Sequence, residues 1–338
     1  MKSMKTTYNI IGTSCFLTAI LIVFLVSCSK EEEKPLKVIT TSVKDVSLTS
    51  VSCEGKVTSD GGSEIISRGI CWNTYYSLTE LGMNDAPTIV DNHTTEGTGL
   101  GSFTSEISGL TPNTAYNYRA YVTNKLETVY GDLIVHSTGS LADADGNVYH
   151  TVTIGLQEWM LENLKTTKYN DGTAIPFVTD DAAWKTLTGP AYCYSDNNES
   201  YKTPYGALYN WHAVNTAKLC PPGWHVPTDA DWNELISGYG QPAVAGEMLK
   251  EAGTAHWIEP NSFANNVSGF TALPGSFRSY MDGKFNNFGY FGYYWSSDEF
   301  DADNAMSVVM VFNNASIVLE DNHKGSGLFV RCVKDSAK

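Results

Sequence analysis

Short runs in which apolar and polar residues alternate dominate the chain after its N-terminal segment. Between residues 40 and 58, Val51 and Val57 belong to a series of apolar residues interleaved with serine, threonine and lysine. An Asp-Gly-Gly turn signal at residues 60–62 separates this region from a second run at residues 65–72. Alternation with a period of two, bounded by glycine-rich turns, is typical of half-buried β-strands. The pattern therefore predicts an all-β unit in this part of the chain.

A helical pattern occurs much later, in residues 228–237. Thr228 can cap a helix, and two aspartates follow it in what would be the positively polarised first turn. An apolar stripe at helical spacing follows, made of Trp232, Leu235 and Ile236. We predict helices at about 228–237 and 243–252, packed on irregular antiparallel strands.

The N-terminal segment has a third pattern. Two lysines precede an apolar stretch from about Ile10 to Val26, which is the form of an export signal. The stretch is short for a spanning helix, which needs about 20 apolar residues. It ends in Leu-Val-Ser-Cys28 and resembles the bacterial lipobox, which implies cleavage of residues 1–27 and acylation of Cys28. The alternative is a single N-terminal membrane anchor. We favour the lipobox because the position, order and flanking charges all fit.

Charge excludes one class of partner. The formal net charge is −15, and removal of residues 1–27 changes it to −17, because two lysines and no acidic residue leave. Nucleic-acid binding is not expected, because it needs clustered Lys and Arg. Residues 28–36 form an acidic linker, and its stretch 29–33 resembles the export signal after the lipidated cysteine of Bacteroidetes surface lipoproteins. We expect a protein that its N-terminal lipid anchors in the outer membrane, exposed on the cell surface.

Residues 109–122 read GLTPNTAYNYRAYV, a turn that leads into a strand of alternating aromatic residues. This stretch resembles the tyrosine-bearing corner and following strand of fibronectin type III sandwiches. The wider pattern, with SDGG, RGICW and YGD, is similar to the type III-like modules of Bacteroidetes surface proteins. The resemblance covers residues 37–138. It implies an all-β sandwich that acts mostly as a spacer, since a fold alone does not confer function.

A second resemblance covers residues 141–335. It is carried by separated motifs that follow in order, among them DGNVY, QEWM, YGALYNW, CPPGWHVPT, GFTALPG, YWSS and VRCVKD. These motifs resemble the Fibrobacter succinogenes major paralogous domain, and the resemblance implies no particular activity. One departure is GSFR at residues 275–278, where the family commonly has a second Gly and a Tyr. The helix entry at residues 227–232 is similar to one in C-type-lectin-like folds, which implies a compact α+β domain of that kind.

The cysteine content suggests one bond. Seven cysteines are present, of which Cys15 leaves with the signal and Cys28 takes the lipid. The exported compartment permits disulfides. The lectin-like resemblance implies a disulfide between Cys220 and Cys332, which would tie the last strand to the predicted helix.

Five cysteines remain in the mature chain, so at least one of them is expected to stay unpaired. Cys53 and Cys71 fall in neighbouring strands of the predicted sandwich. If Ile70 and Trp72 face the core, alternation points Cys71 away from it, and the two thiols cannot meet. Cys193 is then left over as a small buried hydrophobe.

No motif points to catalysis. HExxH, GxSxG and CxxC do not occur, and the seven histidines are scattered. His225 lies between Trp224 and Val226, where a structural role is favoured. We predict a protein that is not an enzyme and has no cofactor and no metal site. An enzyme of the sulfatase-modifying type is the least favoured alternative, because it would need a reduced, exposed cysteine in the C-terminal domain.

Aromatic residues are the more suggestive feature of the C-terminal domain, since seven of the eight tryptophans lie after residue 140. Most of these aromatic side chains are expected to fill a small hydrophobic core, but some rings near Trp295 could lie at the surface and stack on sugars. The candidate ligand contacts are Trp295, Tyr294 and Arg278, beside the further rings Tyr290, Phe291 and Tyr293. We predict a binding or adhesion head for a glycan or a surface protein. The alternative is a structural protein of the cell envelope without a small ligand.

Overall fold

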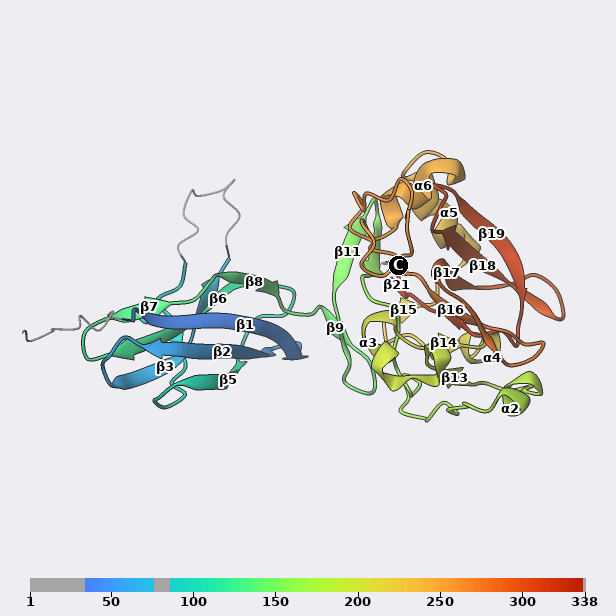
Figure 1. The fold of residues 1–338 in the computed structure, drawn as a ribbon. Coiled ribbons are helices and arrows are strands. Elements are labelled where there is room, and N and C mark those ends of the chain that lie inside the picture. The colour runs from blue at the N-terminus through green and yellow to red at the C-terminus, as the bar shows by residue number, and fades with distance from the viewer. Residues whose placement is uncertain (1–33, 76–85, 337–338) are drawn as a thin grey trace, which may run out of the picture.

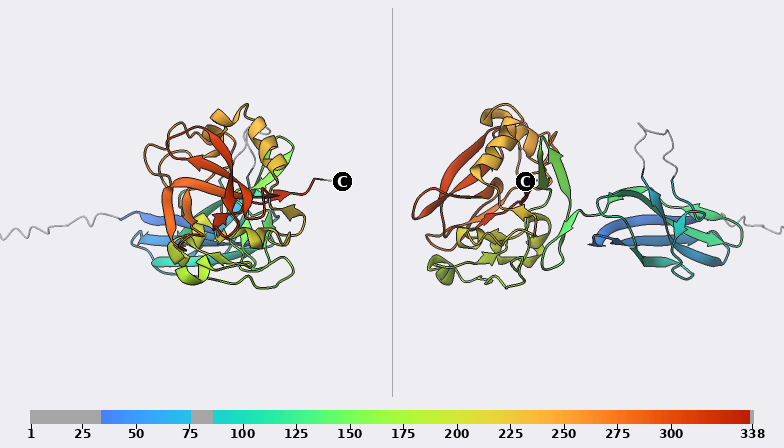
Figure 2. Two further views of the ribbon diagram at one scale, coloured as in Figure 1. Left: turned by 90° about the vertical axis from the view of Figure 1, so that its right-hand side faces the viewer. Right: turned by 180° about the vertical axis from the view of Figure 1, so that it is seen from behind.

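The computed structural model describes residues 34–75 and 86–336. The predicted signal peptide, Cys28 and most of the acidic linker lie outside the described residues. An N-terminal β-sandwich and a larger C-terminal head lie side by side and join near strand β9 (Leu141–Ala142) (Figure 1). The view from behind shows the same arrangement (Figure 2). Among the described residues, no helix is long and apolar enough to cross a membrane.

Two antiparallel sheets form the N-terminal sandwich. One has the order β1-β2-β5, and the other has the order β4-β3-β6-β7 with β8 paired to β6. The strands are β1 (Leu36–Ser47), β2 (Ser50–Asp60), β3 (Ile65–Thr74), β4 (Asn92–His93), β5 (Gly101–Ser108), β6 (Ala115–Asn124), β7 (Thr128–Tyr130) and β8 (Ile134–Ser137). Two such sheets around one core are the architecture of fibronectin type III domains, so the predicted fibronectin type III-like sandwich is confirmed.

The sequence pattern explains this sandwich. In β5, Phe103 and Ile107 are buried, whereas the residues on either side of each are exposed. They meet Tyr118 of the opposite sheet, whose side chain has no exposed surface, in the same core. The predicted tyrosine corner is also present, because the hydroxyl of Tyr116 accepts a hydrogen bond from the backbone N–H of Thr111 at 3.0 Å.

Two main sheets build the head. One has the order β11-β12-β21-β15, and the other has the order β13-β14-β20-β17-β18-β19 with β16 paired to β17. A hairpin of β9 and β10 precedes them. The strands are β10 (Val148–Tyr149), β11 (Thr151–Ile154), β12 (Gln157–Met160), β13 (Tyr192–Cys193), β14 (Leu208–Tyr209), β15 (Trp224–His225), β16 (Gly275–Arg278), β17 (Phe285–Glu299), β18 (Asn304–Val311), β19 (Ile317–His323), β20 (Leu328–Phe329) and β21 (Val333–Lys334).

Two helices lie where the sequence predicts them, α5 (Asp229–Ser237) and α6 (Pro242–Leu249). Thr228 caps α5, and its side chain and that of Asp231 form a reciprocal capping box. The predicted apolar stripe is buried. The remaining helical segments are single turns or little more: α2 (Asp181–Lys185), η1 (Ser195–Asn197), η2 (Glu199–Tyr201), α3 (Lys202–Tyr205) and α4 (Trp211–Val214).

The prediction of an α+β, C-type-lectin-like head is wrong. Helices hold only about 12% of the described residues, and α5, the longest of them, has nine residues. Most of the head is antiparallel sheet and loop. The helical pattern around residues 228–249 is real but local. The segments on either side are rich in glycine, aromatic and β-branched residues, which favour strands and turns over helices.

Around residues 294 and 295 the larger sheet of the head is covered on both faces, so these neighbouring residues of β17 enter different cores. Tyr294 packs in one core with Trp232 of α5, and their ring centroids are 6.0 Å apart. Trp295 packs in the other core with Tyr209 and Trp211. A strand with two buried faces has no obvious polar side in its sequence, which is why the aromatic segment 290–295 looks uniform along the chain.

Candidate functional site

The three predicted ligand contacts lie inside the head. Trp295, Tyr294 and Arg278 each have 0% exposure. The indole N–H of Trp295 donates to the backbone oxygen of Tyr209 at 2.7 Å, and the hydroxyl of Tyr294 donates to that of Leu273 at 2.8 Å. Enclosed rings with satisfied polar atoms cannot stack on a ligand. The prediction of these residues as ligand contacts is therefore wrong, and they belong to the core.

The buried Arg278 side chain is fully engaged within the head. Its guanidinium donates to the backbone oxygens of Thr179, at 2.8 Å, and Gly283, at 2.7 Å. It also pairs with Asp181 at 3.2 Å and lies 4.4 Å from the ring centroid of Trp184. Backbone carbonyls and one carboxylate accept hydrogen bonds from the guanidinium, so Arg278 holds the segment around residue 180 against strand β16 and is not available to bind a ligand.

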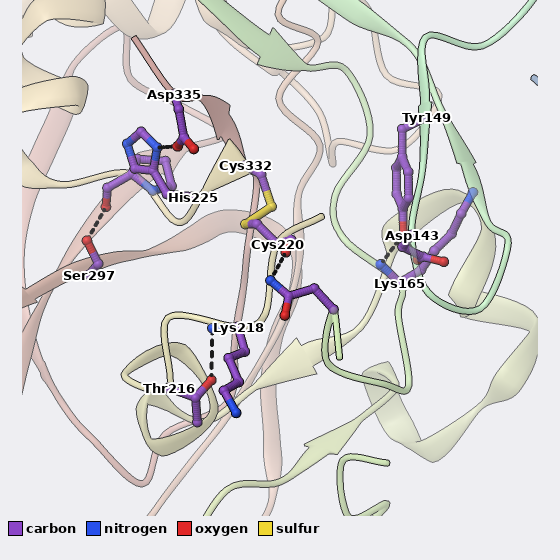
Figure 3. Close-up of a disulfide and its surroundings, with 12 residues drawn as sticks. Asp143, Tyr149, Lys165, Thr216, Lys218, Cys220, His225, Ser297, Cys332 and Asp335 are labelled. Atoms are coloured by element: carbon purple, nitrogen blue, oxygen red, sulfur yellow. Dashed lines mark hydrogen bonds and ion pairs between the residues drawn. A yellow bond between two sulfur atoms is a disulfide. The ribbon is translucent and has the colours of Figure 1, made fainter. Parts of the chain in front are cut away.

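The predicted disulfide is confirmed. Cys220 and Cys332 are bonded, with their Cα atoms 6.0 Å apart, and theirs is the one disulfide in the described part of the chain. Figure 3 shows the bond with His225 and Asp335 beside it. It joins the segment after α4 to the segment that leads into β21, so the middle of the head's sequence is linked covalently to its end.

His225 is held between two carboxylates. Its Nδ1 lies 2.7 Å from Oδ1 of Asp335, and its Nε2 lies 3.1 Å from Oδ2 of Asp231. Hydrogen bonding to Asp231 and then to Asp335 raises the pKa of His225 above its ordinary value, against the effect of burial. Since both ring nitrogens are occupied, this histidine has the structural role that the sequence favours.

The three free cysteines, Cys53, Cys71 and Cys193, are all buried. Cys53 lies in the sandwich core, whereas the thiol of Cys71 points to the backbone oxygen of Pro87 at 3.2 Å. The predicted separation of Cys53 and Cys71 is therefore confirmed. Burial raises the pKa of Cys193 to about 12. The nucleophile is the thiolate, so Cys193 is inert at neutral pH.

Two rings of β17 are partly accessible on the face opposite Tyr294. Tyr293 precedes Tyr294 by one residue and therefore faces the other side of the sheet. Its ring centroid lies 5.4 Å from that of Phe291, with the planes stacked at 20°, and 5.5 Å from that of Phe277 on β16. All three side chains are half-buried. We call Phe277, Phe291 and Tyr293 the aromatic row.

Polar and apolar groups border the aromatic row. The side-chain amide of Asn287 donates to the hydroxyl of Tyr293 at 3.2 Å. Burial raises the pKa of Tyr293, and the nearby Glu320 carboxylate adds to that effect, so the hydroxyl stays protonated. The sheet register places Val309 beside Tyr293 and Val318 beside Val309, and Val318 is 42% exposed. The row thus continues into an apolar strip with an amide and a carboxylate at its edges.

This arrangement suits a flat, partly apolar ligand. Ring faces offer contact area to C–H groups, while the amide and carboxylate offer one donor and one acceptor to hydroxyl groups. A sugar ring has both kinds of surface. Alternation along β17 places Phe291, Tyr293 and Trp295 on one face of the sheet, but it does not separate the accessible rings from the buried Trp295.

Comparisons with known proteins identify the head. The family model of the Fibrobacter succinogenes major domain matches residues 152–334, which is more than half of the chain, and the protein therefore belongs to this family. This confirms the resemblance seen in the sequence motifs. No curated protein matches the chain.

Several solved structures are similar to parts of the chain. The sensor domain of the anti-sigma factor RsgI4 from Pseudobacteroides cellulosolvens is 17% identical, with a TM-score of 0.23, and covers 32% of this chain and 98% of its own. A myokine structure is 12% identical, with a TM-score of 0.23, over 31% and 98% of the two chains. The third fibronectin III domain of the human KIAA0343 protein is 16% identical, with a TM-score of 0.25, over 34% and 93%.

Proposed function

We propose that this protein is a lipid-anchored cell-surface lipoprotein whose head binds a glycan without catalysis, through the aromatic row. In this proposal the lipid on Cys28 anchors the chain, the glutamates at residues 31–33 keep the sandwich clear of the membrane, and the sandwich is a spacer. The supporting observation is the row itself: half-buried, stacked rings beside Asn287 and Glu320.

Binding is favoured over catalysis for two reasons. The free thiols of the described residues are buried, which disfavours the sulfatase-modifying type of enzyme that the sequence left open. His225, beside the disulfide, has both nitrogens held by carboxylates. By contrast, the aromatic row presents contact area that needs no chemical step to be useful.

A glycan array tests the binding proposal. The mature chain with Cys28→Ser, which removes the lipid, is expected to bind a subset of glycans. For the best glycan, Tyr293→Ala or Phe291→Ala should weaken binding roughly 2- to 13-fold, which corresponds to about 0.5–1.5 kcal/mol for one stacked ring. Tyr293→Phe keeps the ring and should retain most of the affinity.

Tyr290→Ala is the matched control. Tyr290 is on the same strand and is 41% exposed, but it faces the other side of the sheet and packs on Phe312. Its loss should leave binding unchanged. Circular dichroism should show the same fold in all variants. Absence of binding to any glycan, or equal weakening by Tyr290→Ala, would refute the proposal; binding to surface proteins alone would replace the glycan by a protein ligand.

Metabolic labelling tests the anchor. Cells that express the full chain are expected to incorporate labelled palmitate into it, and Cys28→Ala should abolish incorporation. Protease added to intact cells should digest the protein if it is exposed on the surface. Labelling that persists in Cys28→Ala would contradict the lipobox prediction.

A further inference from the structure

Three chemistry-bearing side chains from distant parts of the sequence meet where the sandwich joins the head. Asp45 comes from β1 and His136 from β8, both in the sandwich, whereas His150 lies between β10 and β11 in the head. Each offers one nitrogen or oxygen, and these atoms all lie within 4.8 Å of one another. The proposed glycan-binding function does not use this cluster.

The two histidines approach the same carboxylate. Nε2 of His136 lies 3.0 Å from Oδ1 of Asp45, and Nε2 of His150 lies 3.1 Å from Oδ2 of Asp45. The Asp45 side chain is only 8% exposed. Its Oδ2 is buried and, despite the nearby His150 ring, accepts no hydrogen bond of good geometry. A buried carboxylate oxygen of this kind is a costly feature that a ligand would satisfy.

A fourth residue orients one of the rings. Nδ1 of His150 lies 2.7 Å from Oε1 of Glu162, and the other oxygen of Glu162 accepts the backbone N–H of His150 at 2.8 Å. This fixes the ring so that Nε2 points to Asp45. Metal-binding histidines nearly always donate their second ring N–H to a carboxylate or carbonyl in this way. Nε2 of His150 also lies 2.9 Å from the backbone oxygen of Ser137.

We propose that Asp45, His136 and His150 bind one zinc ion, with Glu162 as the residue that positions His150. Zinc takes imidazole nitrogens and carboxylate oxygens at about 2.0–2.2 Å in a tetrahedron, which puts neighbouring ligand atoms about 3.3 Å apart. The contacts of Asp45 with His136, through Oδ1 at 3.0 Å, and with His150, through Oδ2 at 3.1 Å, are close to that spacing, and the three ligand atoms lie within 4.8 Å of one another. A water or the Ser137 carbonyl oxygen completes the four ligands.

The donor set selects the class of metal. Calcium and magnesium prefer all-oxygen sites, whereas two imidazoles and one carboxylate suit zinc. The chain is also strongly acidic, with a formal net charge of −15, which favours approach of a dication. Zinc binding displaces any proton from the two Nε2 atoms, so the ion replaces the hydrogen bonds seen there.

The consequence is a bond between domains. Two ligands belong to the sandwich and one to the head, so the zinc ion ties the spacer to the binding domain. The two domains already pack closely where they join. A Cβ atom on Gly139 would lie 2.0 Å from Cγ1 of Val148 and 3.3 Å from Oδ2 of Asp45, so there is no room for a side chain at this position. A zinc ion held here fixes the direction in which the head projects from the sandwich.

Zinc titration of the mature chain with Cys28→Ser tests the site, and the protein should carry no polyhistidine tag. After treatment with a chelator, it should bind one equivalent of zinc by calorimetry and elemental analysis, and bind no calcium or magnesium. His136→Gln and His150→Gln should each weaken zinc binding more than about 100-fold, and Glu162→Gln about 10- to 100-fold. His93→Gln, which changes an exposed histidine of β4, should not change it.

Two further measurements do not depend on the variants folding. X-ray absorption of the zinc-loaded protein should show two imidazole ligands and no sulfur. Small-angle scattering should show a narrower range of shapes with zinc than with chelator. The proposal is overturned if zinc is not taken up at stoichiometric amounts, if His136→Gln and His150→Gln bind it as the parent does, or if the spectrum lacks imidazole.

Discussion

Removal of the Cys220–Cys332 bond is expected to destabilise the head strongly and to leave the sandwich unchanged. The two cysteines are 112 positions apart in the sequence, so the bond closes a long loop. Such a bond reduces the conformational entropy of the unfolded chain, and its effect grows with the logarithm of loop length. The perturbation is the double variant Cys220→Ala/Cys332→Ala.

The chain-entropy relation gives the magnitude. For a loop of 112 residues it predicts a loss of about 5 kcal/mol in the free energy of unfolding. Residual structure in the unfolded state lowers this figure, and native disulfides typically contribute about 2–5 kcal/mol. Both side chains are nearly fully buried, at 3% and 0% exposure, so the lost sulfur contacts add to the effect of the double variant rather than offset it.

Urea unfolding followed by tryptophan fluorescence is the assay, because seven of the eight tryptophans lie after residue 140 and therefore report on the head. The double variant should unfold at lower urea concentration than the parent. Dithiothreitol should lower the stability of the parent by a similar amount and should not affect the double variant. A loss below about 1 kcal/mol, well under the usual range for a native disulfide, would refute the reasoning, as would equal sensitivity of parent and double variant to dithiothreitol.

Three further perturbations give expected outcomes. Thr228→Ala removes the oxygen that accepts the backbone N–H of Asp231 at 3.2 Å, and it should cost about 0.5–2 kcal/mol in urea unfolding, whereas Thr228→Ser should cost less. The carboxylates of Asp231 and Asp335 raise the pKa of His225 above 6.5. The protonated histidine therefore stabilises the fold fully below pH 6.5, and this stabilisation is lost as the pH rises through the raised pKa. In His225→Gln the urea midpoint should fall less over this pH range than in the parent, and an equal fall would contradict the prediction. Gly283 has φ 74° and a Cβ there would lie 2.2 Å from a backbone oxygen. Gly283→Ala should therefore lower the melting temperature more than Gly253→Ala, where φ is 82° but the space is open.

The sequence predicted the features that depend on a few neighbouring residues. Helix α5 begins after its capping threonine, because the cap and the apolar stripe are both local signals. The separation of Cys53 from Cys71 followed from alternation within two strands. The fold class of the head did not follow, because one well-marked helix was given more weight than the strand-forming residues around it. The meeting of Asp45, His136 and His150 could not be predicted either, since it depends on how two domains join.

The aromatic segment shows the limit of local reasoning most clearly. Tyr293 and Trp295 have the same parity on β17, so alternation places them on one face of the sheet. Trp295 is nevertheless buried, because the indole N–H of Trp211 donates to the backbone oxygen of Ser296 at 3.1 Å, and Tyr209 accepts the indole N–H of Trp295. The covering segment lies more than 80 positions away in the sequence. Where its cover ends, the same face becomes accessible at Tyr293. The position of the candidate binding site is thus decided by the extent of a tertiary contact, which no pattern within β17 contains.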